Sequence, residues 1–187
     1  MATDKNIIAQ WQPESSRGIV KRIIATGALI LETPAHFGAG EQTGNDLVIL
    51  EDALENKPLI PGASLAGALR HYLWQREKGY RSEFSPDRKS YAERLFGTAL
   101  ENDKGHQSRV IVDDALGDGS LTIRDGVKID GITRTAEDGA LFTVQVWERG
   151  TTFDLRFELC IYAEDVRQGK SAELIQAFAV ALDALGN

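Results

Sequence analysis

Several titratable residues lie in and around one glycine-rich stretch of the chain. Residues 33–45 (TPAHFGAGEQTGN) contain three glycines and a proline, a composition that predicts a loop. His36 lies in this loop, and Asp46 follows it directly. A carboxylate here could accept a proton or hold a divalent metal, and a histidine could act as a general acid or base. The alternatives are a solvated acid and a histidine bonded to backbone, because both are common in loops.

Neighbouring residues narrow the chemistry of this loop. No Lys-Ser or Lys-Thr pair follows the glycines, so the loop is not a P-loop for nucleotide phosphates. Glu41 and Asp52 are the other acids close by, and we expect each to be a solvent-facing charge. From the residues alone, Asp46 is likewise expected to be a solvated loop acid, with Glu41 and Asp52 as alternates to it.

A second stretch, Leu59–Arg70 (LIPGASLAGALR), predicts a helix start. Pro61 suits the first turn of a helix, and Ser64 is expected to cap its free N–H groups. Small residues around Gly67 leave room for another backbone or for a phosphate at the helix N-terminus. The alternative is close packing of this helix on a sheet.

These candidates must be positioned by an alternating set of strands and helices. Hydrophobic periodicity and turn signals predict the following elements: a strand or two over 18–32, a short apolar run over 46–52, helices over 61–77 and 91–96, a strand over 109–113, a hairpin with arms 121–130 and 141–147 around a tip at 131–139, a strand over 153–162, and a final helix over 171–185 capped by Ser171.

The order of these elements indicates the fold class. A strand, a helix, several strands and a helix form an α+β domain, a modified ferredoxin-like unit without its closing strand. We therefore expect one domain over residues 1–187, with an active loop at 33–58, a helical insertion at 61–107 and a hairpin insertion at 121–147. The missing strand leads us to expect a partner or a longer parent chain.

Composition and charge exclude several classes of protein. A chain of 187 residues with 42% hydrophobic residues can form a core, and no apolar run approaches the ~20 residues of a membrane span. A single Cys160 excludes an internal disulfide, so we expect a cytoplasmic protein. The net charge of −7 argues against promiscuous binding to nucleic acid. Only residues 61–110 carry an excess of basic residues, which makes that segment the expected side for a polyanion.

Five stretches in order resemble the RAMP (repeat-associated mysterious protein) superfamily, specifically the backbone subunit of type III CRISPR effector complexes. Together they span most of residues 19–160. They are His36–Gly40 followed by Asp46, Leu59–Arg70, Arg94–Gly97, Lys128–Phe142 and Gly150–Phe153.

The resemblance implies a fold, a function and partners. The fold would be a modified RNA-recognition-like fold in which the hairpin at 121–147 is a "thumb" that disrupts the guide–target duplex. The function would be binding of guide CRISPR RNA and metal-dependent cleavage of complementary target RNA, with Mg²⁺ or another divalent cation. Expected partners are guide RNA, target RNA, neighbouring RAMP subunits and the large effector subunit, with no membrane.

The resemblance also assigns roles to individual residues. Asp46, six residues before Asp52 as in the cleaving members, would be the catalytic residue and the metal ligand. The residues expected to contact RNA are His36, Gly38, Gly40, Ser64, Gly67, Arg70, Lys128 and Arg134. Alanines at positions 66 and 68 replace basic residues that relatives often carry, so RNA contact at the helix would depend on backbone amides, Ser64 and Arg70.

Two other functions remain open. The chain could be an inert scaffold that holds guide RNA while cleavage occurs elsewhere. It could also be a metal-independent ribonuclease that processes guide RNA with His36.

Overall fold

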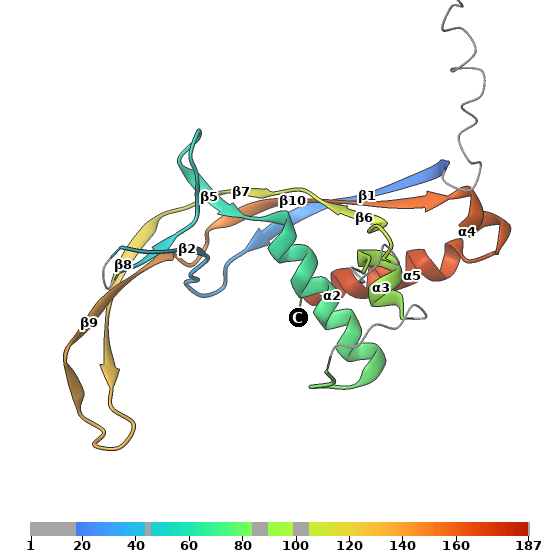
Figure 1. Ribbon diagram of the computed structural model, residues 1–187. Helices are drawn as coiled ribbons and strands as arrows, with labels where there is room; N and C mark the ends of the chain where they lie inside the picture. Colours follow the sequence, from blue (N-terminus) through green and yellow to red (C-terminus); the bar gives the residue numbers. More distant parts are fainter. Residues whose placement is uncertain (1–17, 44–45, 84–89, 99–104, 187) are drawn as a thin grey trace, which may run out of the picture. The chain divides into compact units, whose positions relative to one another are not determined.

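The computed structural model describes residues 18–43, 46–83, 90–98 and 105–186 (Figure 1). The chain divides into two compact units. We call residues 1–25, 66–112 and 157–187 the helical unit, and residues 26–65 and 113–156 the hairpin unit. Three elements continue along the chain from one unit into the other: β1 (Ile19–Ile30), α2 (Gly62–Lys78) and β10 (Thr152–Tyr162).

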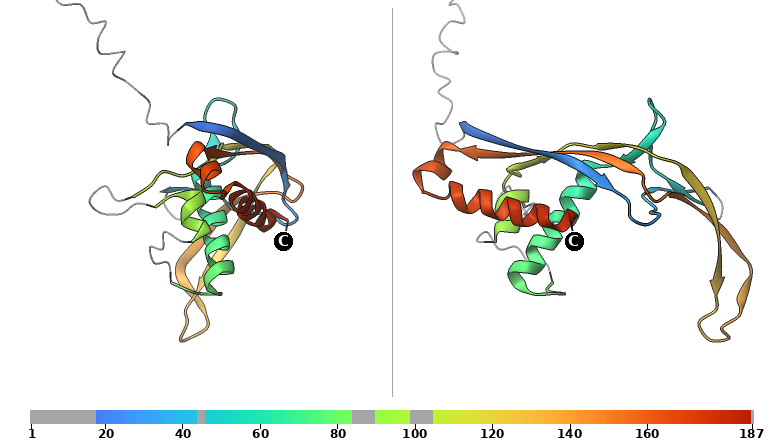
Figure 2. Two further views of the ribbon diagram at one scale, coloured as in Figure 1. Left: turned by 90° about the vertical axis from the view of Figure 1, so that its right-hand side faces the viewer. Right: turned by 180° about the vertical axis from the view of Figure 1, so that it is seen from behind.

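The helical unit packs short helices against strands. β6 (Val110–Val112) pairs antiparallel with β10, with Val112 opposite Phe157. α3 (Tyr91–Phe96) and α5 (Ser171–Leu182) lie side by side on one side of β10 in the views of Figures 1 and 2. α4 (Ala163–Arg167) follows β10, and the short 3-10 helix η1 (Asp183–Leu185) follows α5. The buried apolar residues of this unit are Leu69, Leu73, Trp74, Ala92, Leu95, Val110, Phe157, Leu159, Ile161, Leu174, Ala177, Phe178 and Ala181.

The hairpin unit is built from strands. One sheet has the order β2 (Gly38–Thr43), β3 (Asp46–Ile49), β9 (Ala136–Trp147) and β8 (Leu121–Ile129). β3 and β9 are parallel, whereas β2–β3 and β8–β9 are antiparallel. In a second group, β5 (Lys57–Ile60) pairs with β4 (Glu51–Asp52) and with β7 (Ala115–Asp118). The core of this unit consists of Ile49, Ile60, Leu65, Ala115, Val146, Trp147, Phe153 and Leu155.

This mixed architecture confirms the predicted α+β class and is compatible with a ferredoxin-like or RNA-recognition-like fold. The apolar and polar alternation over 153–162 predicts one buried and one exposed face of β10. The apolar face is buried as predicted (Phe153, Leu155, Phe157, Leu159 and Ile161), but Glu158 and Cys160 of the other face are buried as well. The hairpin is also confirmed, although its second arm begins at Ala136, earlier than predicted. The glycine-rich loop was predicted to be irregular throughout, and this is wrong, because residues 38–43 form β2.

Glu158 differs from its predicted outward position. It lies on the polar face of β10, yet only 5% of it is exposed. Its Oε1 accepts a hydrogen bond from Nη1 of Arg22 at 2.6 Å, and β1 is the neighbour of β10 in the sheet. A buried carboxylate needs such a partner, and a strand that is distant in sequence supplies it.

Both predicted serine caps are wrong. α2 begins at Gly62, so Ser64 is its third residue, and the N–H of Gly62 donates to Oδ1 of Asp114 at 2.7 Å. Ser171 is the first residue of α5, and its hydroxyl has no hydrogen-bond partner within the described ranges. The cap of α2 comes from a residue 52 positions away, which local sequence cannot reveal.

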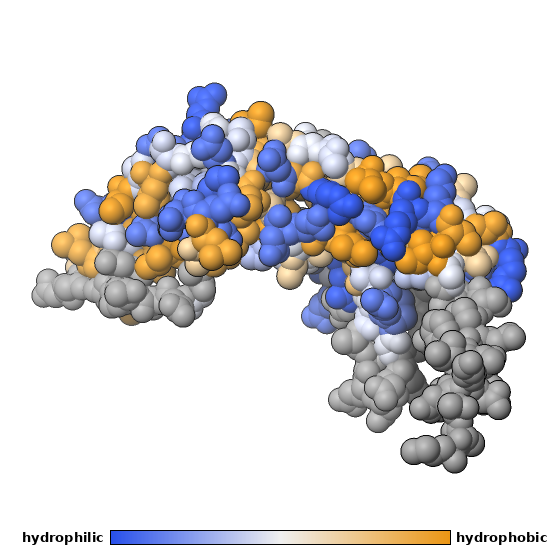
Figure 3. Space-filling view, turned by 90° about the horizontal axis from the view of Figure 1, so that it is seen from above, coloured by the Kyte–Doolittle hydropathy of each residue, from blue (hydrophilic) through white to orange (hydrophobic). Residues whose placement is uncertain are grey.

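Apolar side chains also reach the surface. Figure 3 shows apolar residues mixed with hydrophilic ones over the face seen from above. Exposed apolar residues of β1 and the hairpin include Ile19, Val20, Ile24, Ile30, Ile123, Ile129 and Leu141. In the part of the chain that the structure describes, no helix has both the length and the apolar character needed to cross a bilayer.

Candidate functional site

Asp46 is the first residue of β3, the strand that lies between β2 and β9. In the backbone register it stands opposite Thr43 of β2, and the next residue, Leu47, pairs with Val144 of β9. The structure describes the backbone of Asp46, whereas its side chain lies outside the described part. Because β3 is the direct neighbour of the hairpin strand β9, the sheet places the candidate catalytic position on the strand beside the hairpin.

His36 is attached to the same hairpin strand. Its Nδ1 lies 2.8 Å from the backbone carbonyl oxygen of Gln145. A carbonyl oxygen only accepts hydrogen bonds, so Nδ1 carries the hydrogen, and Nε2 of the neutral ring is left as an acceptor. The preceding residue, Ala35, exchanges two backbone hydrogen bonds with Trp147, at 3.0 and 2.8 Å. His36 is exposed, so its Nε2 could accept a proton from a bound molecule.

Gln145 connects three segments of the site, and no sequence motif points to it. Its backbone carbonyl binds His36, while its side-chain Oε1 accepts a hydrogen bond from the N–H of Ile49 at 3.2 Å. One residue of β9 thus links the glycine-rich segment to the end of β3. A glutamine within a strand is ordinary in sequence, and only the parallel pairing of β3 with β9 reveals its role.

The two glycines of the motif have structural reasons to be glycine. A Cβ on Gly38 would lie 3.0 Å from Nε2 of His36, which is tighter than most contacts of real Cβ atoms. Gly40 has φ of +76°, a conformation that favours glycine. Gly38 therefore leaves the space in which the His36 ring lies.

The hairpin carries two residues predicted to contact RNA, one on a strand and one in its turn. Lys128 lies on β8, and Arg134 lies in the turn with φ of 56°. Oδ1 of Asp130 accepts hydrogen bonds from the N–H groups of Ile132 and Thr133, at 2.9 and 2.6 Å, and from the Thr133 hydroxyl. These bonds, those from Thr133 first, lower the pKa of the Asp130 carboxyl. The turn thus holds the exposed Arg134 on an ordered backbone.

The remaining predicted residues lie on α2. Ser64 belongs to the hairpin unit, whereas Gly67 and Arg70 belong to the helical unit. The Asp114 carboxylate already occupies the N–H of Gly62, and a second anion there would meet its negative charge. This arrangement weakens the expectation of a phosphate at the start of α2.

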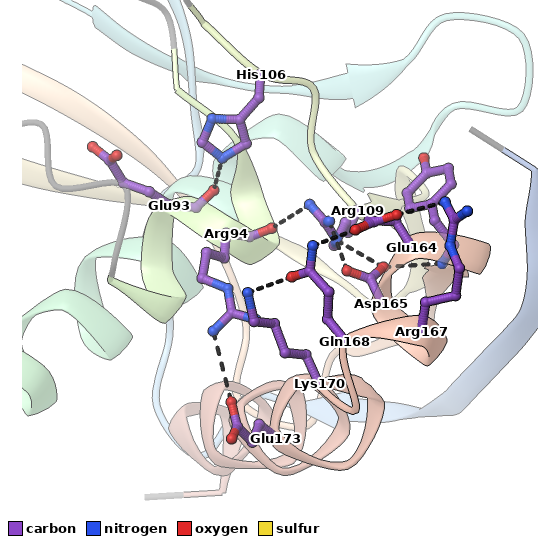
Figure 4. Close-up of polar contacts among 11 residues, drawn as sticks. Glu93, Arg94, His106, Arg109, Glu164, Asp165, Arg167, Gln168, Lys170 and Glu173 are labelled. Carbon is purple, nitrogen blue, oxygen red and sulfur yellow. Dashed lines mark hydrogen bonds and ion pairs between the residues drawn. The ribbon is translucent and has the colours of Figure 1, made fainter. Parts of the chain in front are cut away.

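The basic segment 61–110 uses part of its charge internally. In Figure 4, Nε and Nη2 of Arg109 donate to the two carboxylate oxygens of Asp165, at 3.3 and 2.9 Å. Nη1 of Arg94 lies 3.9 Å from Oε2 of Glu173. In the same network, Nε2 of His106 donates to the backbone carbonyl of Glu93 at 2.8 Å. These contacts join α3, α4 and α5, so they explain the basic residues by packing of the helical unit.

The described side chains alone do not form a metal site. Among the described side chains, no three His, Cys, Asp or Glu residues group closely enough to hold a metal ion. The Asp46 carboxylate lies outside that set. Magnesium is often held by one or two protein carboxylates together with substrate phosphates, so a site based on Asp46 is compatible with this chemistry.

Comparison with known proteins identifies the family of the chain. A search of curated proteins found no match. A sequence model of the RAMP superfamily matches residues 29–186, a range that contains the glycine-rich segment, α2, the hairpin and β10. This superfamily is associated with CRISPR complexes and with RNA binding. The match covers most of the chain, and the protein therefore belongs to the RAMP superfamily.

Proposed function

We propose that this protein is a backbone subunit of a type III CRISPR effector complex, where it binds guide RNA and cleaves complementary target RNA. One observation carries the proposal. The glycine-rich segment, the backbone of Asp46 and the thumb hairpin all belong to one sheet, joined by the parallel pairing of β3 with β9. A hairpin that displaces a target base would then belong to the same sheet as the residue that cleaves the RNA beside that base.

The chemistry requires three contributions. Attack of a ribose 2′-OH on the adjacent phosphate needs removal of a proton, neutralisation of phosphate charge and an in-line geometry. Displacement of a base by the hairpin lets the RNA backbone reach that geometry. Asp46 would hold a divalent cation together with RNA phosphate oxygens, and that cation would supply the charge neutralisation. Base pairing with the guide selects the sequence, so the protein needs to contact only backbone and shape.

The exposed apolar face of the hairpin supports assembly with neighbouring subunits. Ile123, Val127 and Ile129 alternate along β8, and Leu141 pairs with Val127 across the hairpin. These residues are between 45% and 70% exposed. Exposed apolar side chains such as the paired Val127 and Leu141 are suited to contact with a partner protein.

A second candidate function is favoured by the anchoring of His36. Its Nε2 is an exposed acceptor on a ring fixed by Gln145, which suits a general base in metal-independent processing of guide RNA. An inert scaffold is the third possibility, since guide binding does not need the Asp46 carboxylate.

The decisive experiment uses the assembled complex with labelled target RNA. Asp46→Ala should abolish the cut beside this subunit while guide RNA stays bound. Asp154→Asn, which changes an exposed carboxylate of β10, is the matched control and should cut normally. Persistent cutting in Asp46→Ala refutes the catalytic role and leaves the scaffold. Cleavage of precursor RNA in chelator that is lost in His36→Ala would instead establish the processing ribonuclease.

A further inference from the structure

A small pocket lined by charged and apolar residues lies at the base of the hairpin, on the hairpin unit. It has a volume of about 230 Å³ and is lined by Pro34, Thr122, Arg124, Val146, Glu148 and Arg149. A water molecule takes about 30 Å³ of liquid volume, so the pocket has room for a group such as a phosphate with some of its hydration. None of these residues was singled out by the sequence.

The walls of the pocket are fixed by hydrogen bonds. Thr122 and Arg124 are two positions apart on β8, so their side chains point to the same face. The Thr122 hydroxyl donates to Oε1 of Glu148. Arg149 follows Glu148 in a tight turn, in which the N–H and hydroxyl of Thr151 both donate to the Glu148 carbonyl oxygen. The next residue, Gly150, donates its N–H to the carbonyl of Leu31 at 2.8 Å, so the backbone around Arg149 is held in place.

The two guanidinium groups of the pocket have no protein partner among the described residues. Neither the Arg124 side chain nor the Arg149 side chain takes part in a hydrogen bond or an ion pair there. Arg22, Arg109 and Arg167, in contrast, are each bonded to a carboxylate. Two guanidinium groups and one carboxylate leave the pocket with an excess positive charge, and the nearby Glu148 carboxylate already accepts from Thr122.

We propose that Arg124 and Arg149 clamp a phosphodiester group of RNA at the base of the hairpin. The inference rests on the proposed RNA binding and extends it to a defined contact. Guanidinium groups bind phosphate oxygens with two parallel N–H donors, which makes paired arginines strong phosphate ligands. The pocket also borders the segment that leads to His36, because Pro34 lines it and Ala35 pairs with Trp147. An RNA strand held here would pass beside the candidate site.

The test measures binding of the full chain to a mixed-sequence guide RNA, alone and annealed to target RNA, over a range of salt concentrations. Arg124→Gln and Arg149→Gln should each weaken binding and lower the salt slope by about 0.7 to 0.9, as expected when one phosphate contact is lost. The double variant should lose about tenfold or more in affinity, because hydrogen bonds to charged groups are strong. Glu148→Gln should tighten binding, since it removes the opposing charge and keeps an acceptor for Thr122.

Arg167→Gln is the matched control, because it removes the same charge from an exposed position in the helical unit. The inference is overturned if the pocket variants bind like this control, if Glu148→Gln weakens binding, or if the losses depend on RNA sequence. Losses with guide RNA alone assign the phosphodiester to the guide, and losses only with the duplex assign it to the target. Unchanged binding in the pocket variants alongside lost cleavage in Asp46→Ala would refute the clamp and keep the proposed function. Failure of the unmodified chain and complex to bind RNA would refute both.

Discussion

The carboxylate of Asp114 accepts a hydrogen bond from the backbone N–H of Gly62 at 2.7 Å, at the first residue of α2. The two residues are 52 positions apart, and both belong to the hairpin unit. The helix on which the RAMP motif centres therefore begins with an internal carboxylate. This contact stabilises the helix start, and it also determines what else can bind there.

Removal of this cap should destabilise the protein. Loss of an N-terminal cap costs about 0.5–2 kcal/mol, so Asp114→Ala should lower the free energy of unfolding by about 1 kcal/mol in denaturant titrations. Asp118→Ala, at an exposed position of β7, is the control and should change it by less than about 0.5 kcal/mol. Equal stability of the two variants would contradict the capping role.

Gly67 should tolerate a side chain. A Cβ at this position meets nothing within 4 Å, and alanine is favoured over glycine within a helix by about 0.5–1 kcal/mol. Gly67→Ala should therefore raise the free energy of unfolding by about that amount. RNA affinity should stay unchanged, because the Asp114 carboxylate disfavours phosphate at the start of α2. A marked loss of affinity would show that RNA approaches this helix after all.

A side chain at Gly38 should crowd the His36 ring. A Cβ would lie 3.0 Å from Nε2 of His36, so Gly38→Ala should shift the ring by a few tenths of an ångström and weaken its hydrogen bond to the Gln145 carbonyl. We expect a changed NMR signal of the His36 ring and weaker RNA binding, with a folded protein by circular dichroism. An unperturbed His36 signal would mean that the ring adjusts without cost.

The carboxylate of Glu93 is an unusual feature of α3. It is fully buried, and within the described ranges neither of its oxygens has a hydrogen-bond partner. An unsatisfied buried polar group costs about 1–3 kcal/mol, so Glu93→Met should raise the free energy of unfolding by about 1 kcal/mol or more. Glu93→Gln serves as the comparison, because it keeps the shape and a polar group. A destabilised Glu93→Met protein would contradict this account.

The order of the hairpin turn should depend on pH. Hydrogen bonds from Thr133 and Ile132 lower the pKa of Asp130 in the folded chain, so its contribution to stability is present above about pH 4 and lost as the pH falls through the lowered value. The protection factors of the Ile132 and Thr133 amides, taken relative to the intrinsic exchange rate at each pH, should fall over that acidic range. In Asp130→Ala these protection factors should be low throughout, and high protection would refute the role of the carboxylate.

Local patterns predicted the regular elements well, because they depend on nearby residues. The i, i+4 spacing of Leu65, Leu69 and Leu73 predicts a buried stripe on α2, and all three leucines are buried. A glycine after an apolar helical stretch predicts a helix end, and α3 ends before Gly97, whose φ is 78°.

β2 was missed because its glycine-rich composition is typical of a loop, although its partner strand β3 follows directly in the sequence. Other failures depend on residues far away in sequence. The cap of α2 and the anchor of His36 come from Asp114 and Gln145, and the clamp residues Arg124 and Arg149 meet only through the hairpin register and the turn after it. The motif identified the family, but it could not show which charges the fold leaves unpaired.

The link between His36 and Gln145 spans 109 residues, and the one between Ile49 and Gln145 spans 96. Contacts of such long range form late, since the chain must close a large loop before they stabilise it. During synthesis, the glycine-rich segment leaves the ribosome well before β9 exists. The candidate site can therefore assemble only after β9 has been made, and it stays incomplete in shorter nascent chains.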